Sequence, residues 1–470
     1  MTRNLLCLLG AVVFLISCSL APQYSRPEAP VPDAWPTGAA YEKSTPTPGS
    51  TGALEIQWRE FFSDARLQEL IATALENNRD LRLAALNVRR AQAIYGIRRA
   101  ELYPAVDAFA EGSKQRVPAD LSSDGQAKTT ERYDVGLGIA SWEIDFFGRI
   151  RSLKDRALEE FLATEQARRS AQILIVSAVA EAYLALAADR ENLALAMDTF
   201  KNQKYAYDLV KRRRDVGIGT ELDLRQAQTQ VDIARRDIAI YTQRVAQDEN
   251  ALNFLCGTPS PVPREILPAD LAHVAPLKDI SAGLSSEVLL QRPDILQAEN
   301  LLKAANANIG AARAALFPRI SLTTAVGTAS SELSGLFESG SGTWLFAPQA
   351  TLPIFDARLW SALDATQAER EIALVQYEKA IQNAFREVAD ALAVRGTVND
   401  QVAAQQSLVE ALAETYRLSD MRYAKGVDNY LAVLVAQRSL YAAQQVLVVL
   451  RLAKRAGQVR LYAVLGGGAD

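Results

Sequence analysis

The sequence is poor in the residues that most enzymes use, with a single histidine and three cysteines among 470 residues. His273 lies in a proline-rich segment, where a solvated loop side chain is expected, so it supports neither a Ser-His-Asp triad nor a His/Cys metal site. No phosphate-binding loop is present either. The net charge of −4 excludes a bulk attraction to nucleic acid. We therefore expect no enzyme, no metal site and no nucleic-acid partner.

Long apolar runs are also scarce, and the first one is short. Residues 5–16 are almost entirely apolar and follow Arg3, which fits a secretory signal peptide better than a membrane-spanning helix. The run ends at Ser17 and Cys18, which resembles a bacterial lipobox, where the cysteine is acylated and becomes the mature N-terminus. By resemblance to sorted lipoproteins, Ser19 in place of aspartate implies the outer membrane. A plain signal peptide with an incidental cysteine is the alternative.

No run of 18 apolar residues follows the signal. The best candidate, residues 173–188, is interrupted by Glu181, so no transmembrane helix is expected. A chain that spans a membrane without helices must do so with strands. Once Cys7 is cleaved off and Cys18 carries lipid, Cys256 is left alone, which excludes an internal disulfide. We expect Cys256 to be a small buried hydrophobe.

The chain contains an internal repeat. A helical run extends from Asp80 to Pro104, and a similar run 214 residues later extends from Asp294 to Pro318. Later positions repeat 209 residues apart, which pairs Gly217 with Gly426. Regular self-similarity of this kind indicates two copies of one structural unit. The change of spacing places one loop of variable length inside each copy.

Proline, the strongest helix breaker, is absent between Pro118 and Pro259 and again after Pro353. Apolar residues in these stretches recur every three or four positions, as in a helix. We predict helices at residues 66–102, 150–215, 221–255, 286–316, 359–424 and 430–464. The two longest would each extend about 100 Å, at about 1.5 Å per residue. Helices of that length are typical of coiled coils or bundles.

Segments of alternating polarity separate the paired helices. We predict one hairpin at residues 104–144, with strands at 104–117 and 132–144 around a polar loop at 118–131, and another at residues 318–353. Their strands of about 10–13 residues would suffice for a tilted outer-membrane strand. Two soluble hairpins packed on helices are the alternative. Because four strands cannot close a barrel and open edges are costly in lipid, we expect oligomerisation, and three chains would supply twelve strands.

These features together resemble the TolC family of outer-membrane efflux proteins, in its OprM-like lipoprotein branch. The most specific motifs lie at residues 77–81, 142–149, 290–295, 309–318 and 426–431. The resemblance covers essentially the whole chain. It implies a mixed α/β membrane protein, a homotrimer with a 12-stranded β-barrel in the outer membrane and a long α-helical barrel across the periplasm. It also implies a periplasmic adaptor and an inner-membrane RND-type pump as partners, and export of drugs or other small toxic molecules.

The resemblance also implies a periplasmic gate where the long helices turn back, with Gly217 and Gly426 as hinges. Asp223 falls on the gate-linking aspartate of the family, and Tyr423 falls on its tyrosine partner. Val435 stands where relatives often have an acid, which leaves Asp428 as the acid nearest the pore. For both aspartates the alternative role is N-capping or a first-turn charge on the returning helix.

The predicted organisation is a signal peptide at residues 1–17, a lipidated extended tether at 18–62, a first repeat at 63–262, a linker at 263–285 and a second repeat at 286–470. The only expected cofactor is the covalent lipid on Cys18, which anchors the protein to the outer membrane. Exit ducts for type I protein secretion or heavy-metal efflux remain alternatives. A structural coiled-coil protein without a pore is another, although the two hairpins argue against it.

Overall fold

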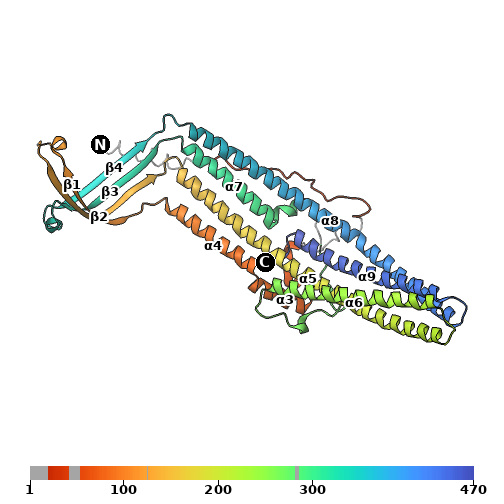
Figure 1. Ribbon diagram of the computed structural model, residues 1–470. Helices are drawn as coiled ribbons and strands as arrows, with labels where there is room; N and C mark the ends of the chain where they lie inside the picture. The colour runs from red at the N-terminus through yellow and green to blue at the C-terminus, as the bar shows by residue number, and fades with distance from the viewer. Residues whose placement is uncertain (1–19, 42–52, 124, 281–284, 470) are drawn as a thin grey trace. The chain divides into compact units, whose positions relative to one another are not determined.

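The computed structural model describes residues 20–41, 53–123, 125–280 and 285–469 (Figure 1). The predicted signal peptide and the predicted lipidation site, Cys18, lie outside these residues. The main helices are α2 (Trp58–Phe61), α3 (Ala65–Asn77), α4 (Arg79–Ala100), α5 (Arg149–Asp215), α6 (Glu221–Cys256), α7 (Pro293–Ala314), α8 (Ala357–Ala424) and α9 (Tyr430–Val464). The strands are β1 (Asp107–Val117), β2 (Lys128–Ile144), β3 (Arg319–Ser330) and β4 (Gly342–Thr351). Short 3-10 helices lie at Ala53–Glu55, Ala119–Leu121, Arg264–Ile266, Ser286–Gln291 and Leu333–Gly335.

The chain forms two compact units, and each draws on both repeats. Unit 1 contains the four strands and comprises Met1–Glu28, Asn87–Thr164 and Gln297–Tyr377. Unit 2 comprises Ala29–Leu86, Glu165–Leu296 and Glu378–Asp470. The helices α5 and α8, with 67 and 68 residues, each contribute to both units without a break.

Two of the predicted helices are interrupted at equivalent positions of the repeats. Asn78 has an extended backbone, and its side-chain oxygen accepts hydrogen bonds from the amides of Asp80 and Leu81, so it ends α3 and caps α4. In the second copy Arg292 is also extended, because the residue before a proline avoids helical angles, and α7 begins at Pro293. The prediction of single helices over 66–102 and 286–316 was therefore wrong at these two positions.

In unit 1 the strands form one antiparallel sheet in the order β1-β2-β3-β4 (Figure 1). Each predicted hairpin is present, and β2 and β3 join the two repeats, from Tyr133 opposite Ser330 to Ile144 opposite Ile320. β2 begins four residues earlier than predicted, and its first five residues, 128–132, pair with β1 but not with β3. A register shift between Ile139 and Trp142 marks a bulge in the same pair of strands.

The N-terminal tether also contributes to unit 1. We call its residues 20–28 the strap, because they run in extended form along α7. Arg26 and Tyr24 bond to the buried carboxylate of Glu299, with an Arg26 Nη2–Glu299 Oε2 distance of 2.6 Å. Towards the other end of α7, Arg313 donates to the carbonyl of Leu20. The strap is therefore held by side chains at both ends of one helix.

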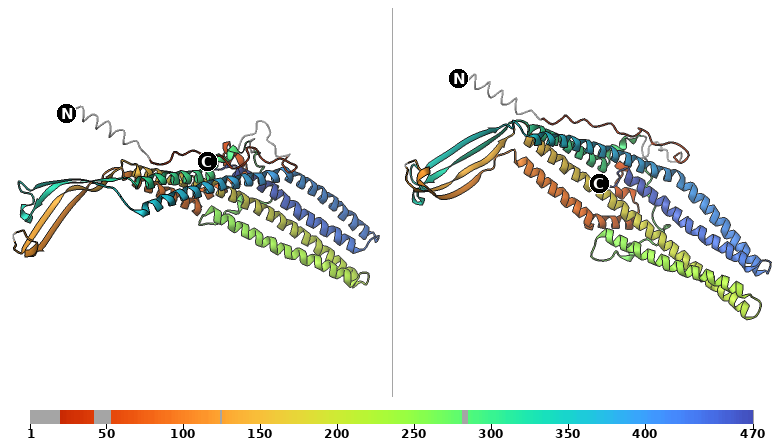
Figure 2. Two further views of the ribbon diagram at one scale, coloured as in Figure 1. Left: turned by 90° about the horizontal axis from the view of Figure 1, so that it is seen from above. Right: turned by 45° about the horizontal axis from the view of Figure 1, so that its top comes forward.

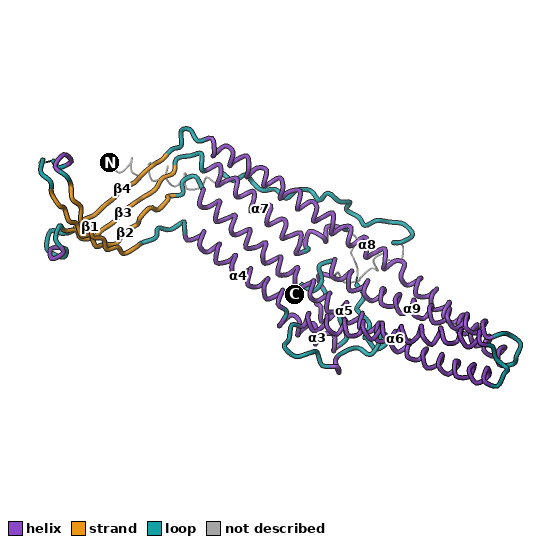
Figure 3. Tube along the Cα trace, in the orientation of Figure 1, coloured by secondary structure: helices purple, strands orange, loops and turns teal. Residues whose placement is uncertain are grey.

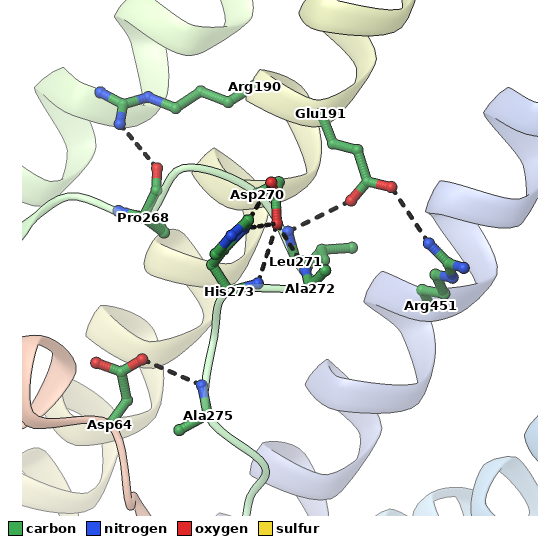
Figure 4. A network of polar contacts seen from close by, with 10 residues as sticks. All are labelled: Asp64, Arg190, Glu191, Pro268, Asp270, Leu271, Ala272, His273, Ala275 and Arg451. Atoms are coloured by element: carbon green, nitrogen blue, oxygen red, sulfur yellow. Dashed lines mark hydrogen bonds and ion pairs between the residues drawn. The ribbon is translucent and has the colours of Figure 1, made fainter.

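In unit 2 the linker between the repeats is fastened to the helices by polar contacts (Figure 4). Arg190 of α5 donates to the carbonyl of Pro268 at 2.8 Å, and Glu191 accepts from the amide of Leu271 and pairs with Arg451 of α9. His273 lies against Asp270 with a largely exposed ring, as expected of a loop histidine. Burial alone would raise the pKa of Asp270, but the hydrogen bonds from His273 and neighbouring amides hold it below its usual range.

The most apolar helical segments belong to the core of unit 2. By length and composition, α5 and α9 each contain a window that could cross a membrane, and 61% of the α5 window is buried. Val179, Tyr183 and Leu184 of α5 are almost fully buried, so this part of α5 is core. Cys256 is free and fully buried at the end of α6, and burial raises the pKa of its thiol to about 11, as expected of a small hydrophobe.

Candidate functional site: the sheet and the two helical turns

One face of the sheet is crowded at its centre by three glycines. A side chain at Gly136 would come within 2.7 Å of the carbonyl oxygen of Val326, and one at Gly327 would meet the backbone of Val135 and Gly136. Gly138 is similarly close to Thr324 and Ala325. Neighbouring backbones approach one another most closely on the inner side of a bend, so this is the concave face. The strands are visibly curved in both views of Figure 2.

The concave face carries most of the polar side chains. Because paired residues point to the same side of a sheet, the register assigns both hairpins to their faces. The concave face includes Asp107, Phe109, Glu111, Ser113, Arg132, Asp134, Ser321, Thr323, Ala325, Thr343, Leu345 and the three glycines. Arg132 forms a two-pronged ion pair with Asp134. A polar, concave face of this kind suits the wall of an aqueous channel.

The convex face carries a band of mostly apolar side chains, with Thr324 and Thr328 among them. The apolar side chains include Val135, Leu137, Ile139, Trp142, Ile320, Leu322, Val326, Trp344 and Phe346. Several of these side chains are more than half exposed, including Trp344 at 78% and Phe346 at 61%. Large apolar side chains left exposed together mark a surface made for an apolar environment, here lipid.

The sheet has two unpaired edges within the described part of the chain. β1 pairs only with β2, and β4 pairs only with β3. An unpaired edge within lipid leaves backbone groups without hydrogen bonds, which is costly. The sheet therefore requires further strands at both edges.

In unit 2 the long helices turn back through two short turns of the same design (Figure 3). Gly217 and Gly426 have positive φ angles of 81° and 71° and end α5 and α8. The amide of Ile218 bonds to the carbonyl of Arg213, and that of Val427 bonds to the carbonyl of Arg422. This is the Schellman motif, in which glycine satisfies the last carbonyls of the helix. The predicted glycine turns are confirmed as turns, and their role as hinges stays a prediction.

Asp223 lies in the first turn of α6. The Thr220 hydroxyl accepts a hydrogen bond from the amide of Asp223 and donates one to its carboxylate at 2.7 Å. Thr220 is therefore the N-cap of α6, and the Asp223 carboxylate holds the capping hydroxyl in place, so Asp223 stabilises the start of α6. Asp428 lies within the other turn, where its ion pair with Arg422 lowers the pKa of the Asp428 carboxyl.

Tyr423 belongs to an aromatic cluster that joins the two helical hairpins. Its hydroxyl accepts a 2.7 Å hydrogen bond from Arg213 of α5, and its ring lies 5.2 Å from that of Tyr430. The two rings pack with an apolar core formed by Val210, Leu224, Ala227, Val433 and Leu434. Burial, followed by the nearby Tyr423, raises the pKa of the Tyr430 phenol.

The predicted bond between Asp223 and Tyr423 is not formed within this chain. Asp223 accepts a hydrogen bond from Thr220 instead, and Tyr423 accepts one from Arg213. A link between them across neighbouring chains stays a prediction. Sequence reasoning missed Arg213 and Tyr430. Arg213 had a signal, because it occupies the position in the first repeat that Arg422 occupies in the second. No group of three or more potential metal ligands occurs among the described residues.

The sequence matches a known protein family over both repeats. The model of the outer membrane efflux protein family matches the chain twice, at residues 70–258 and 284–467. The two matches correspond to the two repeats.

Individual proteins that are similar to this chain are also outer membrane proteins or channels. The toluene efflux pump outer membrane protein TtgC of Pseudomonas putida is 48% identical, over 100% of this chain and 96% of its own length. The outer membrane protein OprJ of Pseudomonas aeruginosa is 41% identical, over 97% of this chain and 94% of its own. The open-state crystal structure of the MtrE outer membrane channel of Neisseria gonorrhoeae has a TM-score of 0.87 and 38% identity, covering 96% of this chain and 99% of that one. The chain thus belongs to the outer membrane efflux protein family, a family of ducts and not of enzymes, and acts in the outer membrane as the exit duct of an efflux pump.

Proposed function

We propose that three copies of the chain close one 12-stranded β-barrel and that the trimer exports small, largely apolar toxic molecules. The observation that carries the assembly is the pair of unpaired edges on a four-stranded sheet with one lipid-compatible face. Pairing β4 of each copy with β1 of the next leaves no open edge. Twelve strands also give an even-numbered barrel of a size known in outer membranes.

The proposed cargo follows from the relatives. Similar proteins are named for efflux of toluene, solvents and antibiotics. We infer that this duct works with a periplasmic adaptor and an inner-membrane RND-type pump, and that the pump selects the cargo. The polar concave face supports a water-filled passage.

The assembly is tested by mass measurement of the full chain in mild detergent. A trimer rich in both helix and strand is expected. A monodisperse monomer with intact strands would contradict the proposal, because its edges would then be stable without partners.

The cargo is tested in cells that lack the gene and in cells complemented with it. Complementation should restore survival in toluene and lower the accumulation of a hydrophobic antibiotic. Equal survival of both strains in toluene, with the protein present in the outer membrane, would contradict the proposed substrate class.

A further inference from the structure

The strap on α7 shows how this fold binds an extended peptide. Five residues of α7 form one stripe along the helix, at intervals of three or four positions: Glu299, Lys303, Asn306, Gly310 and Arg313. Asn306 donates to the carbonyl of Pro22 at 2.7 Å, and Arg313 donates to that of Leu20. A side chain at Gly310 would come within 2.8 Å of Ala21, so glycine leaves the space that the strap occupies.

The lengths of the two partners match. From Glu299 to Arg313 the helix rises about 21 Å, at about 1.5 Å per residue. From Arg26 to Leu20 an extended chain covers about 20 Å, at about 3.3 Å per residue. One stripe of a single helix therefore holds the strap along its length, through two backbone carbonyls and through the side chains of Tyr24 and Arg26.

The first repeat carries the corresponding stripe on α4, and no part of the described chain covers it. Counting back 214 residues, Arg89, Gln92, Gly96 and Arg99 correspond to Lys303, Asn306, Gly310 and Arg313. All four are exposed, and no residue of α4 is buried. A side chain at Gly96 would have no atom within 4 Å. The donors and the glycine gap that hold the strap on α7 are thus repeated on α4 without an occupant.

We propose that this stripe of α4 binds an extended acidic segment of a periplasmic partner protein. The charge of the stripe identifies the partner. On α7 the carboxylate of Glu299 neutralises Lys303 at 3.0 Å and binds Arg26 of the strap. The corresponding position on α4 is Ala85, so Arg89 has no such acid beside it.

The strap of another copy is a poor occupant for the same reason. Its Arg26 would face Arg89 in place of a carboxylate, and like charges exclude a wrong partner effectively. A peptide with a carboxylate at that point would instead pair with Arg89, while its carbonyls accept hydrogen bonds from Gln92 and Arg99.

The strap on α7 also has a neighbouring helix beside it, α5, and the corresponding neighbour of the α4 stripe depends on the proposed trimer. On α7, Ser152 of α5 lies beside Gly310, with its hydroxyl 2.6 Å from where a side chain at Gly310 would begin. The residue of α8 that corresponds to Ser152 is Ser361, 209 positions later. α4 leads into the edge strand β1, and α8 follows the other edge strand, β4. Pairing β1 with β4 of the next copy would therefore bring Ser361 of that copy beside Gly96.

The test uses the full-length trimer in detergent and a labelled peptide of strap residues 20–28 with the change Arg26→Glu. Fluorescence anisotropy should show saturable binding. Gly96→Leu should weaken binding at least tenfold, since it places a side chain in the gap at a position where a Cβ atom has no atom of the chain within 4 Å, and Arg89→Ala should weaken it comparably. Arg98→Ala is the matched control, because Arg98 already pairs with Glu101, and it should bind like the wild type. The peptide with its natural Arg26 should bind at least tenfold more weakly.

Equal binding by wild type and Gly96→Leu, or no saturable binding to a verified trimer, would overturn the proposal. Displacement of the peptide by phosphatidylglycerol vesicles but not by phosphatidylcholine vesicles would also overturn it, and would assign the basic stripe to lipid headgroups. A monomeric protein that still binds the peptide through Gly96 would contradict the trimer and leave the peptide groove in place.

Discussion

Asp189 of α5 and Asp248 of α6 face each other, and at this pair the stability of unit 2 should depend on pH. Burial, followed by the charge of Asp189, raises the pKa of Asp248 to about 6. One oxygen of Asp248 is buried without a hydrogen-bond partner, and Arg244 is 3.9 Å from Asp189. A raised pKa in the folded state means that folding holds a proton that the unfolded chain releases.

The stabilisation from that proton is complete below the pKa of an unfolded aspartate and is lost as the pH rises through 6. We therefore expect the melting temperature to fall between pH 5 and pH 7.5, and Asp248→Asn to reduce this fall. Calorimetry of the two proteins at both pH values measures the difference. Asp232→Asn, at an exposed carboxyl on the same helix, serves as the control and should keep the wild-type dependence. Identical pH profiles for wild type and Asp248→Asn would exclude this pair as the source.

Near the turns, Arg213 and Tyr423 form a polar contact between the two helical hairpins of the chain. A hydrogen bond to a charged group contributes about 1.5–3 kcal/mol. If opening the duct separates the hairpins, Tyr423→Phe should favour the open form about tenfold or more. Single-channel recording in planar bilayers should show a higher open probability, and cells should become more sensitive to large antibiotics.

Asp223→Ala distinguishes two roles for the carboxylate beside this contact. Loss of the bond between the Asp223 carboxylate and the capping hydroxyl of Thr220 should by itself lower thermal stability without changing conductance. A change of conductance comparable to that of Tyr423→Phe would instead show that Asp223 takes part in the gate between neighbouring chains.

At the scale of elements, the two faces of β4 should respond oppositely to charge. Phe346 points to the convex face and Ala347 to the concave face. An arginine on the lipid face of a barrel costs about 2–4 kcal/mol near the middle of the membrane, whereas a water-filled interior tolerates it. Phe346→Arg should therefore lower the yield of trimer in the outer-membrane fraction several-fold. Ala347→Arg should assemble normally and reduce cation conductance; equal yields of the two variants would contradict the assignment of faces.

The long helices could be predicted from the sequence, because the absence of proline and the spacing of the apolar residues are both properties of the local sequence. The break at Asn78 is harder to predict, because it also depends on a contact far away in the sequence: Asn78 donates to the carbonyl of Leu255 on α6. The break at Arg292 had a local signal in Pro293, which the prediction of one helix over 286–316 missed. The early start of β2 was missed because residues 128–131 are polar on both faces and lack alternation.

At the two helical turns, too, one feature could be predicted from single residues and another depended on packing. Glycine at Gly217 and Gly426 predicted where the helices end, since a positive φ is a property of the single residue. The repeated arginine at positions 213 and 422 marked Arg213, but its bond with Tyr423 could not be predicted, because it depends on how α5 and α8 pack. Resemblance to relatives pointed to Asp223, whereas the packing within this chain selected Arg213.

For the whole molecule, anchoring and assembly are separable. The lipobox predicts acylation of Cys18, so Cys18→Ser should abolish labelling with radioactive palmitate. The same variant should still form trimers, because pairing of the sheet edges does not involve the lipid. Labelling of the variant at the wild-type level would contradict the assignment, and loss of the trimer would show that the lipid is needed for assembly.

The unequal lengths of the strands have an immunological consequence. Residues 128–132 of β2 continue past the last pair with β3 and carry the β1–β2 hairpin about 16 Å farther, at about 3.3 Å per residue. The helices leave the sheet at its other end, on the periplasmic side, so this hairpin faces the outside of the cell. We expect its tip, with the short helix Ala119–Leu121, to be the part of the protein that antibodies and bacteriophages meet first. Changes at this tip should therefore alter recognition from outside without touching the wall of the duct.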